Sequence, residues 1–157
     1  MSGIFDLLSA RDLLAKLERE LARLRETPDD VDHAFNFLTT AEHMLDWVYP
    51  GDTQKEARKA LREREPLLAT VSHLASGAKH FDRLSEHHKS VQGTSRLGGV
   101  WARGFWAPRL WAKGFWAEPR LSITLAGPAA VAFGGTITAL DLAEKVYAYW
   151  ATPGRVQ

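Results

Sequence analysis

The chain has 157 residues, of which 20 are Lys or Arg, 19 are Asp or Glu and 45% are hydrophobic. These fractions are ordinary for one globular domain. A net charge of +1 excludes a protein that binds nucleic acid through its overall charge. Cysteine is absent, which excludes disulfides, thiolate metal sites and Cys nucleophiles and fits a reducing cytoplasm.

Two segments bear on localisation. Residues 1–6 lack the basic and apolar runs of a secretory signal. The low-charge stretch 121–140 contains glycines and a proline, which is typical of strands and turns rather than of a membrane span. We therefore expect a cytoplasmic protein without a transmembrane segment.

A first helix is expected over residues 4–26. Leu14, Leu17, Leu21 and Leu24 recur at spacings of three and four, which places them on one face. The other faces are charged and include Glu20, so we expect them to be solvated.

Two further core helices follow in the sequence. Thr27-Pro28-Asp29 ends the first helix, and Asp29 is a candidate N-cap for a second helix over 30–48. That segment is apolar on most sides, which is typical of a central helix. A short charged helix through Arg64 precedes a third core helix over 66–80, which begins with proline.

The region after the third core helix is expected to be a loop followed by a strand pair. Residues 81–97 are polar and predict an exposed loop. Residues 121–125 alternate in polarity and predict a strand. After a turn at Gly127-Pro128, residues 129–133 are expected to return as the second strand.

The chain is expected to end in a closing helix, capped by Thr138 and running through Trp150. The predicted fold class is α+β, mainly α: an antiparallel helical bundle with a small β-hairpin element and a C-terminal closing helix. One domain, 1–157, would comprise a helical core at 4–80, a loop and arm at 81–121, and a strand pair with the closing helix at 121–151.

Polar stripes on the second and third core helices are the candidate chemical site. The second helix carries His33, Asn36, Thr40, His43 and, at the edge, Asp46, and the third carries His73, Ser76, Lys79 and His80. If these helices pack antiparallel, the stripes converge, and imidazoles oriented by a carboxylate can perform acid–base chemistry. The candidate catalytic residues are His43, Asp46, His73, Lys79 and His80. The alternative is that these side chains are satisfied residues at the boundary of the core.

Common cofactor and metal motifs are absent from the sequence. There is no HExxH metal motif, no Gly-rich phosphate loop and no Gly-x-Ser-x-Gly elbow. We therefore expect no metal and no cofactor, and neither nucleotide-driven catalysis nor serine hydrolysis.

Two strings suggest a family resemblance. The segment 36–47, NFLTTAEHMLDW, and the later segment 76–81, SGAKHF, resemble small bacterial and phage proteins that end in a strand pair and a helix closing on Trp. The arrangement is loosely similar to HEPN-like helical domains, many of which are ribonucleases of toxin–antitoxin or antiphage systems. Their signature is Arg, four to six residues, then His; His33, His43, His73 and His80 lack an arginine at that spacing. The resemblance implies a site at His43, Asp46, Lys79 and His80.

The least ordinary feature is a tandem repeat over 101–121. WARGFWAPRL is followed by WAKGFWAEPRL, and four of the six tryptophans lie here. Aromatic residues with interleaved cations can stack unpaired bases, lie at a membrane interface or anchor a protein partner. They can also simply cap the helical core. The candidate partner-binding residues are Trp101, Arg103, Phe105, Trp106, Trp111, Lys113, Phe115 and Trp116.

The repeat favours an interaction protein as the first functional hypothesis. In an extended segment, Trp101 and Phe105 share one face and Trp106 lies on the other, so both faces are aromatic. A monomer would leave one of these aromatic faces exposed to water, which is unfavourable. We expect a non-enzymatic protein that uses this arm for self-association or for binding a protein partner. The alternative is a HEPN-like, RNA-processing enzyme or antiphage component using the His-bearing helices, for which RNA would be the partner.

Overall fold

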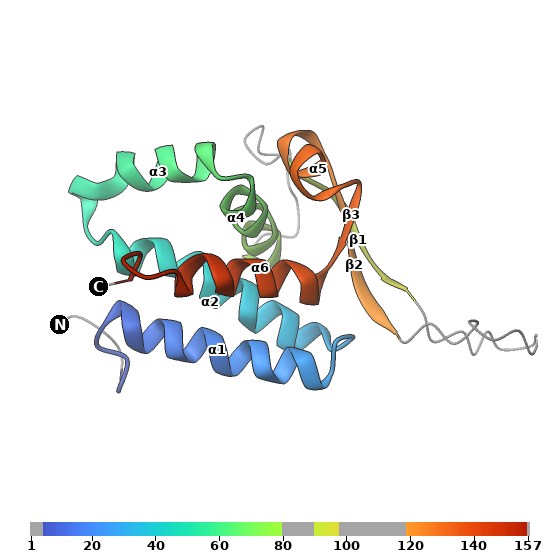
Figure 1. Cartoon of the computed structure of the whole chain (residues 1–157), viewed down its shortest axis with the longest axis horizontal. Helices are drawn as coiled ribbons and strands as arrows, with labels where there is room; N and C mark the ends of the chain where they lie inside the picture. Colours follow the sequence, from blue (N-terminus) through green and yellow to red (C-terminus); the bar gives the residue numbers. More distant parts are fainter. Residues whose placement is uncertain (1–4, 80–89, 98–118, 157) are drawn as a thin grey trace, which may run out of the picture.

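The computed structural model describes residues 5–79, 90–97 and 119–156. Within these ranges the fold consists of α-helices and a small antiparallel sheet, as the predicted mainly-α α+β class requires (Figure 1). The elements, in chain order, are α1 Ala10–Glu26, α2 Val31–Val48, the 3-10 turn η1 Asp52–Gln54, α3 Lys55–Arg64, α4 Pro66–Lys79, β1 Val91–Leu97, β2 Arg120–Leu125, α5 Gly127–Phe133, β3 Thr136–Thr138 and α6 Ala139–Ala151.

Side-chain caps fix where the first two helices begin. The Ser9 hydroxyl accepts from the backbone N–H of Asp12, whose carboxylate accepts from the Ser9 N–H, so α1 starts at Ala10 rather than at residue 4. The carboxylate of Asp30 accepts from the N–H groups of Asp32 and His33. The expected cap at Asp29 is therefore one residue too early.

Helix α2 lies at the centre of the helical body, packed against α1, α4 and α6 (Figure 1). Phe37 and Met44 are fully buried, whereas Val31 and Phe35 of the same helix are exposed. Leu17 of α1 and Trp150 of α6 complete the centre of the core. Helix α3 has no buried residue, and its Leu61 packs partly buried against the core. Burial of these large side chains supplies the main stabilisation of the body, at roughly 25 cal/mol per Å² of apolar surface.

The expected loop over 81–97 is wrong for its last part, because residues 91–97 form β1. Residues 80–89 lie outside the described ranges. Polarity misled the prediction, since β1 is exposed along most of its length and lacks an alternating apolar face. Strand β2, predicted over 121–125, is confirmed over Arg120–Leu125 and is the central strand of the order β1-β2-β3.

The expected returning strand over 129–133 is also wrong, because this segment is the helix α5. Pro128 occupies the first turn, where proline is tolerated, and alanines follow. Gly127 and Gly134 have φ of 54° and 86°, conformations that other residues adopt at a cost, and Gly134 ends the helix. The strand that returns to β2 is instead the three-residue β3.

The closing helix is confirmed as α6, with Thr138 accepting from the Asp141 N–H. The sheet lies at one end of the helical body (Figure 1). Because side chains alternate, Ile123 and Ile137 face the core, whereas Ser95, Leu97 and Arg120 share the outer face.

Candidate functional site

The predicted catalytic residues occupy different environments. His43 is exposed on α2. The carboxylate of Asp46 pairs with the Arg58 guanidinium at 3.0 Å. His73 is buried, at 3% exposure, in α4. Lys79 is the last residue of α4, and its side chain and all of His80 lie outside the described part of the chain.

His73 holds the start of strand β1. Its Nδ1 accepts a hydrogen bond of 3.0 Å from the backbone N–H of Val91, which is also buried. That nitrogen must be unprotonated to accept the bond, so the neutral ring carries its proton on Nε2. Next to this contact, the carbonyl of Ser90 accepts from the N–H of Ala126. His73 therefore has a clear structural role in positioning the hairpin on α4.

His33 also has a structural contact. Its Nδ1 lies 2.7 Å from the Thr27 hydroxyl, and its backbone N–H caps onto Asp30. These bonds connect the end of α1 to the start of α2. The stripe expected on the second helix is thus divided between a turn contact at His33, a buried contact at Thr40 and the exposed His43.

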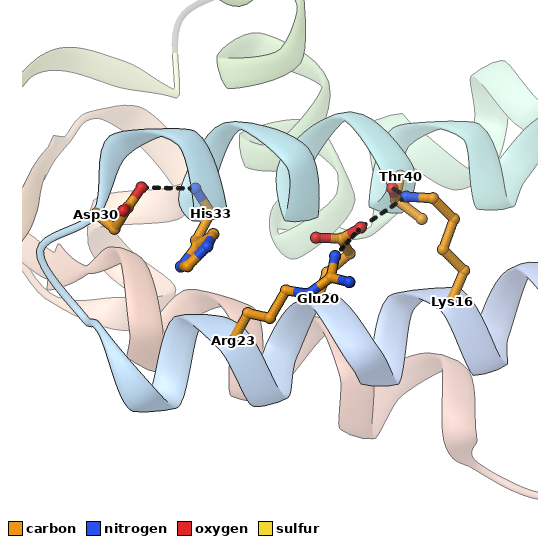
Figure 2. Close-up of polar contacts among 6 residues, drawn as sticks. All are labelled: Lys16, Glu20, Arg23, Asp30, His33 and Thr40. Atoms are coloured by element: carbon orange, nitrogen blue, oxygen red, sulfur yellow. Dashed lines mark hydrogen bonds and ion pairs between the residues drawn. The ribbon is translucent and has the colours of Figure 1, made fainter.

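A partly buried polar cluster joins α1 to α2 (Figure 2). Lys16 donates to the Glu20 carboxylate at 3.0 Å and to the Thr40 hydroxyl at 2.6 Å, and Arg23 approaches the same Glu20 oxygen at 3.4 Å. Glu20 is buried, with its side chain 6% exposed, so its expected solvent-facing position is wrong. The reason is its spacing: residues 13, 17, 20 and 24 form one face of the helix.

A second polar cluster, on α2, α3 and α4, was not found from the sequence. Arg62 donates to Glu42 Oε1 at 2.6 Å, and the Ser72 hydroxyl donates to the same oxygen at 3.2 Å. Glu42 Oε2 and Arg62 Nε are buried without a hydrogen-bond partner among the described residues. The sequence does contain a signal for this cluster. Two acidic residues lie four residues apart on α2, two arginines lie four residues apart on α3, and the structure pairs them as Asp46 with Arg58 and Glu42 with Arg62.

Burial raises the pKa of the Glu42 carboxyl, even though Arg62 and Ser72 act in the opposite direction. A carboxyl with a raised pKa can mark a functional site, but it also occurs in structural ion pairs. Here the Glu42–Arg62 pair attaches α3 to α2. Arg58 of α3 makes a further attachment, because it donates to the carbonyls of Tyr49 and Gly51. We therefore assign this cluster to attaching α3.

The predicted partner-binding residues, from Trp101 to Trp116, lie outside the described residues. The strands that lead to them are described. Leu97 pairs directly with Arg120, so the segment between these residues joins two adjacent strand ends. Arg96 contacts the carbonyl of Asp29 and lies 3.6 Å from its carboxylate, which ties β1 to the α1–α2 turn.

An open groove of about 650 Å³ lies beside these two strand ends. Leu97 and Arg120 line it together with side chains of β3 and the first turns of α6. Its acidic residues already have partners: Asp141 accepts from Thr138 at 2.6 Å, and Glu144 pairs with Arg25 at 2.7 Å. The Arg25 contact lowers the pKa of Glu144. Each described carboxylate that lines the groove therefore has a hydrogen-bond or ion-pair partner within the chain.

Within the described ranges, no group of three or more His, Asp or Glu side chains is arranged to hold a metal ion. The same residues include no helix with the length and apolar character that a membrane span requires. None of the protein-family models, curated proteins or solved structures compared with this chain matches it.

Proposed function

We propose that this is a non-enzymatic interaction protein that works by assembly. The helical body is the support, and the hairpin β1–β2 carries the Trp- and Arg-rich repeat 101–121 that makes the contact. The contact is with a second copy of the chain or with a protein partner. The absence of cysteine supports a cytoplasmic setting for this assembly.

The pairing of Leu97 with Arg120 supports this proposal most directly. Because the two strand ends are adjacent, the chain leaves the described body after Leu97 and returns to it at Arg120 in one place. Val91 is buried at the base of this hairpin, whereas residues 94–97 are exposed. Trp and Arg are the residue types that contribute most to binding energy at protein interfaces, so a paired base supporting them suits an interaction surface.

Light scattering coupled to size-exclusion chromatography tests the proposal. We expect the wild type to elute with a mass above 17.5 kDa and the Trp106→Ala, Trp116→Ala double variant to elute at 17.5 kDa. The matched control is Phe35→Ala, which removes an exposed aromatic side chain from α2 outside the hairpin. Equal masses for the wild type and the double variant would reject the repeat as the surface of self-association.

One sequence observation favours a second candidate function, cleavage of RNA. Unlike the histidines of the core helices, His88 has an arginine at the HEPN spacing: four residues separate it from Arg83. Both residues lie outside the described ranges. We expect RNA cleavage that is lost in His88→Ala and retained in His87→Ala if this function holds. Absence of cleavage by the wild type would reject it.

A further inference from the structure

We propose that strand β1 of one copy pairs antiparallel with β1 of a second copy, with Ser95 opposite Ser95. The two sheets then join into one sheet of six strands across a twofold axis. This inference rests on the proposed function, because it names the second copy as the partner. It also assigns a surface, the outer edge of β1, to which no role has been assigned above.

The outer edge of β1 has main-chain groups available for pairing. Among the described residues, β1 pairs with β2 alone. The backbone N–H of Leu125 donates to the carbonyl of Gly135, on the β3 side. Because backbone N–H and C=O groups alternate between the two edges of a strand, those of alternate residues of β2, including Ser122, are directed towards β1. Their partners in β1 include Ser95 and Leu97. The backbone N–H and C=O groups of Thr94 and Arg96 therefore point to the outer edge of the sheet.

The register follows from those two residues. With Ser95 opposite its counterpart, Thr94 of each copy lies opposite Arg96 of the other, and the pairs exchange four backbone hydrogen bonds. A register centred on Arg96 would place two arginines directly opposite each other, which is unfavourable. In the proposed register each arginine faces a neutral residue and keeps its ion pair with Asp29.

Side-chain shape supports the same register. Leu97 is 52% exposed at the end of the edge strand. Pairing centred on Ser95 places it opposite Gly93 of the other copy. A Cβ added at Gly93 would meet nothing within 4 Å, so there is open space above it. Leu97 and Gly93 share the outer face of the sheet, and each leucine can cover the glycine of the other copy.

The two edges of the sheet differ in ways that favour β1. Strand β1 has seven residues, whereas β3 has three and runs directly into α6. Strand β1 also lacks proline and lysine, the residues that commonly prevent edge-to-edge pairing. Its inner end is closed, because the Val91 N–H is already bonded to His73. The backbone groups that can pair with a second copy are therefore those of the exposed residues 94–97, which restricts the possible registers.

A charge exchange at Ser95 is the decisive test. Ser95 is exposed, so Ser95→Lys and Ser95→Glu should both fold. Each places like charges opposite each other and should elute as a monomer of 17.5 kDa, whereas an equimolar mixture should recover twice that mass. The control is Thr136→Lys, which adds the same charge at an exposed position of the outer face on β3 and should remain a dimer.

A cross-linking test gives an independent readout. The chain has no cysteine, so a Ser95→Cys variant carries a single thiol. Opposed residues of a non-hydrogen-bonded antiparallel pair lie about 4.5 Å apart at Cα, within the range that a disulfide spans. On a non-reducing denaturing gel after mild oxidation, we expect Ser95→Cys to run as a covalent dimer and Thr136→Cys to run mainly as a single chain. A wild-type monomer, or a wild-type dimer without cross-linking at Ser95, overturns the inference.

Failure of this inference can be separated from failure of the proposed function. If the Trp106→Ala, Trp116→Ala variant is monomeric while the Ser95 variants still associate, the repeat makes the contact and the β1 edge does not. If the Ser95 variants are monomeric while the double Trp variant associates, the edge makes the contact and the repeat does not. Loss of association in both sets supports both proposals.

Discussion

In the helical body, the buried Glu20 and the partly buried Glu42 have basic partners, whereas the outer strand of the sheet has main-chain groups without a strand partner among the described residues. Glu20 accepts from Lys16 and Arg23 of its own helix, and Glu42 accepts from Arg62 of α3 and Ser72 of α4. Strand β1 instead exposes Leu97 and the outward groups of Thr94. These charged groups of the body are thus paired within one chain, whereas the edge of β1 is the surface for which we propose a partner.

The largest expected effect is a loss of stability in the helical body from a substitution that leaves the residues of the hairpin unchanged. Phe37 is fully buried in α2, and Phe37→Ala should lower the free energy of unfolding by about 3–5 kcal/mol through lost burial and a cavity. Phe35→Ala is the matched control, since Phe35 lies on the same helix but is 46% exposed. Urea denaturation measures both, and equal losses would contradict the assigned core.

The next effect concerns the junction between body and hairpin. His73→Ala leaves the buried Val91 N–H without its acceptor, which should cost about 1–3 kcal/mol. His73→Asn retains an acceptor oxygen near the position of Nδ1 and should lose less. Hydrogen exchange of the Val91 amide reports the contact directly. Unchanged protection in His73→Ala would show that the bond does not hold β1 to α4.

A smaller effect, visible in its pH dependence, tests the partly buried pair of Glu42 and Arg62. Burial raises the pKa of Glu42 in the folded state, so the folded protein binds a proton at a pH where the unfolded chain has lost it. Stability from this group is present at low pH and is lost as pH rises through the folded-state pKa. We therefore expect wild type to gain stability relative to Glu42→Gln as pH falls from 7 towards about 4.3, the ordinary glutamate pKa. A constant difference would contradict the raised pKa.

The smallest effect has the opposite sign. The hydrogen bond from Arg25 lowers the pKa of Glu144 in the folded state, so its stabilisation is present above the ordinary carboxyl pKa and is lost as pH falls through the folded-state pKa. The pair is largely exposed, so Glu144→Gln should cost little and respond to salt. Thermal unfolding at two salt concentrations measures this. A loss as large as that of His73→Ala would mean that the pair is not a weak surface contact.

The helical fold could largely be predicted from the sequence because its signals are local. The leucine spacing of α1, Pro66 at the start of α4 and Thr138 before α6 each act within a few residues. Strand β1 could not be predicted, because its polar residues gain stability only from pairing with a strand more than twenty residues away. Helix α5 was missed because the preceding strand suggested a hairpin, while Pro128 and the alanines favoured a helical turn.

The candidate site was harder to predict, because its chemistry depends on which helix faces which. His43 and His73 lie on expected helices, yet one is exposed and the other bonds to β1. The polar residues that do contact one another across helices, such as Glu42 and Arg62, belong to partly buried ion pairs that composition alone does not reveal. The outward groups of Thr94 depend on sheet order, which periodicity does not determine.

The central claim is that this protein assembles through its hairpin, and the molar mass of the wild type in solution tests it most directly. Light scattering across micromolar concentrations should give twice the 17.5 kDa of one chain and should fall to 17.5 kDa in the Ser95→Lys variant. A wild-type mass of 17.5 kDa at every concentration would contradict self-assembly, whichever surface of the hairpin is considered.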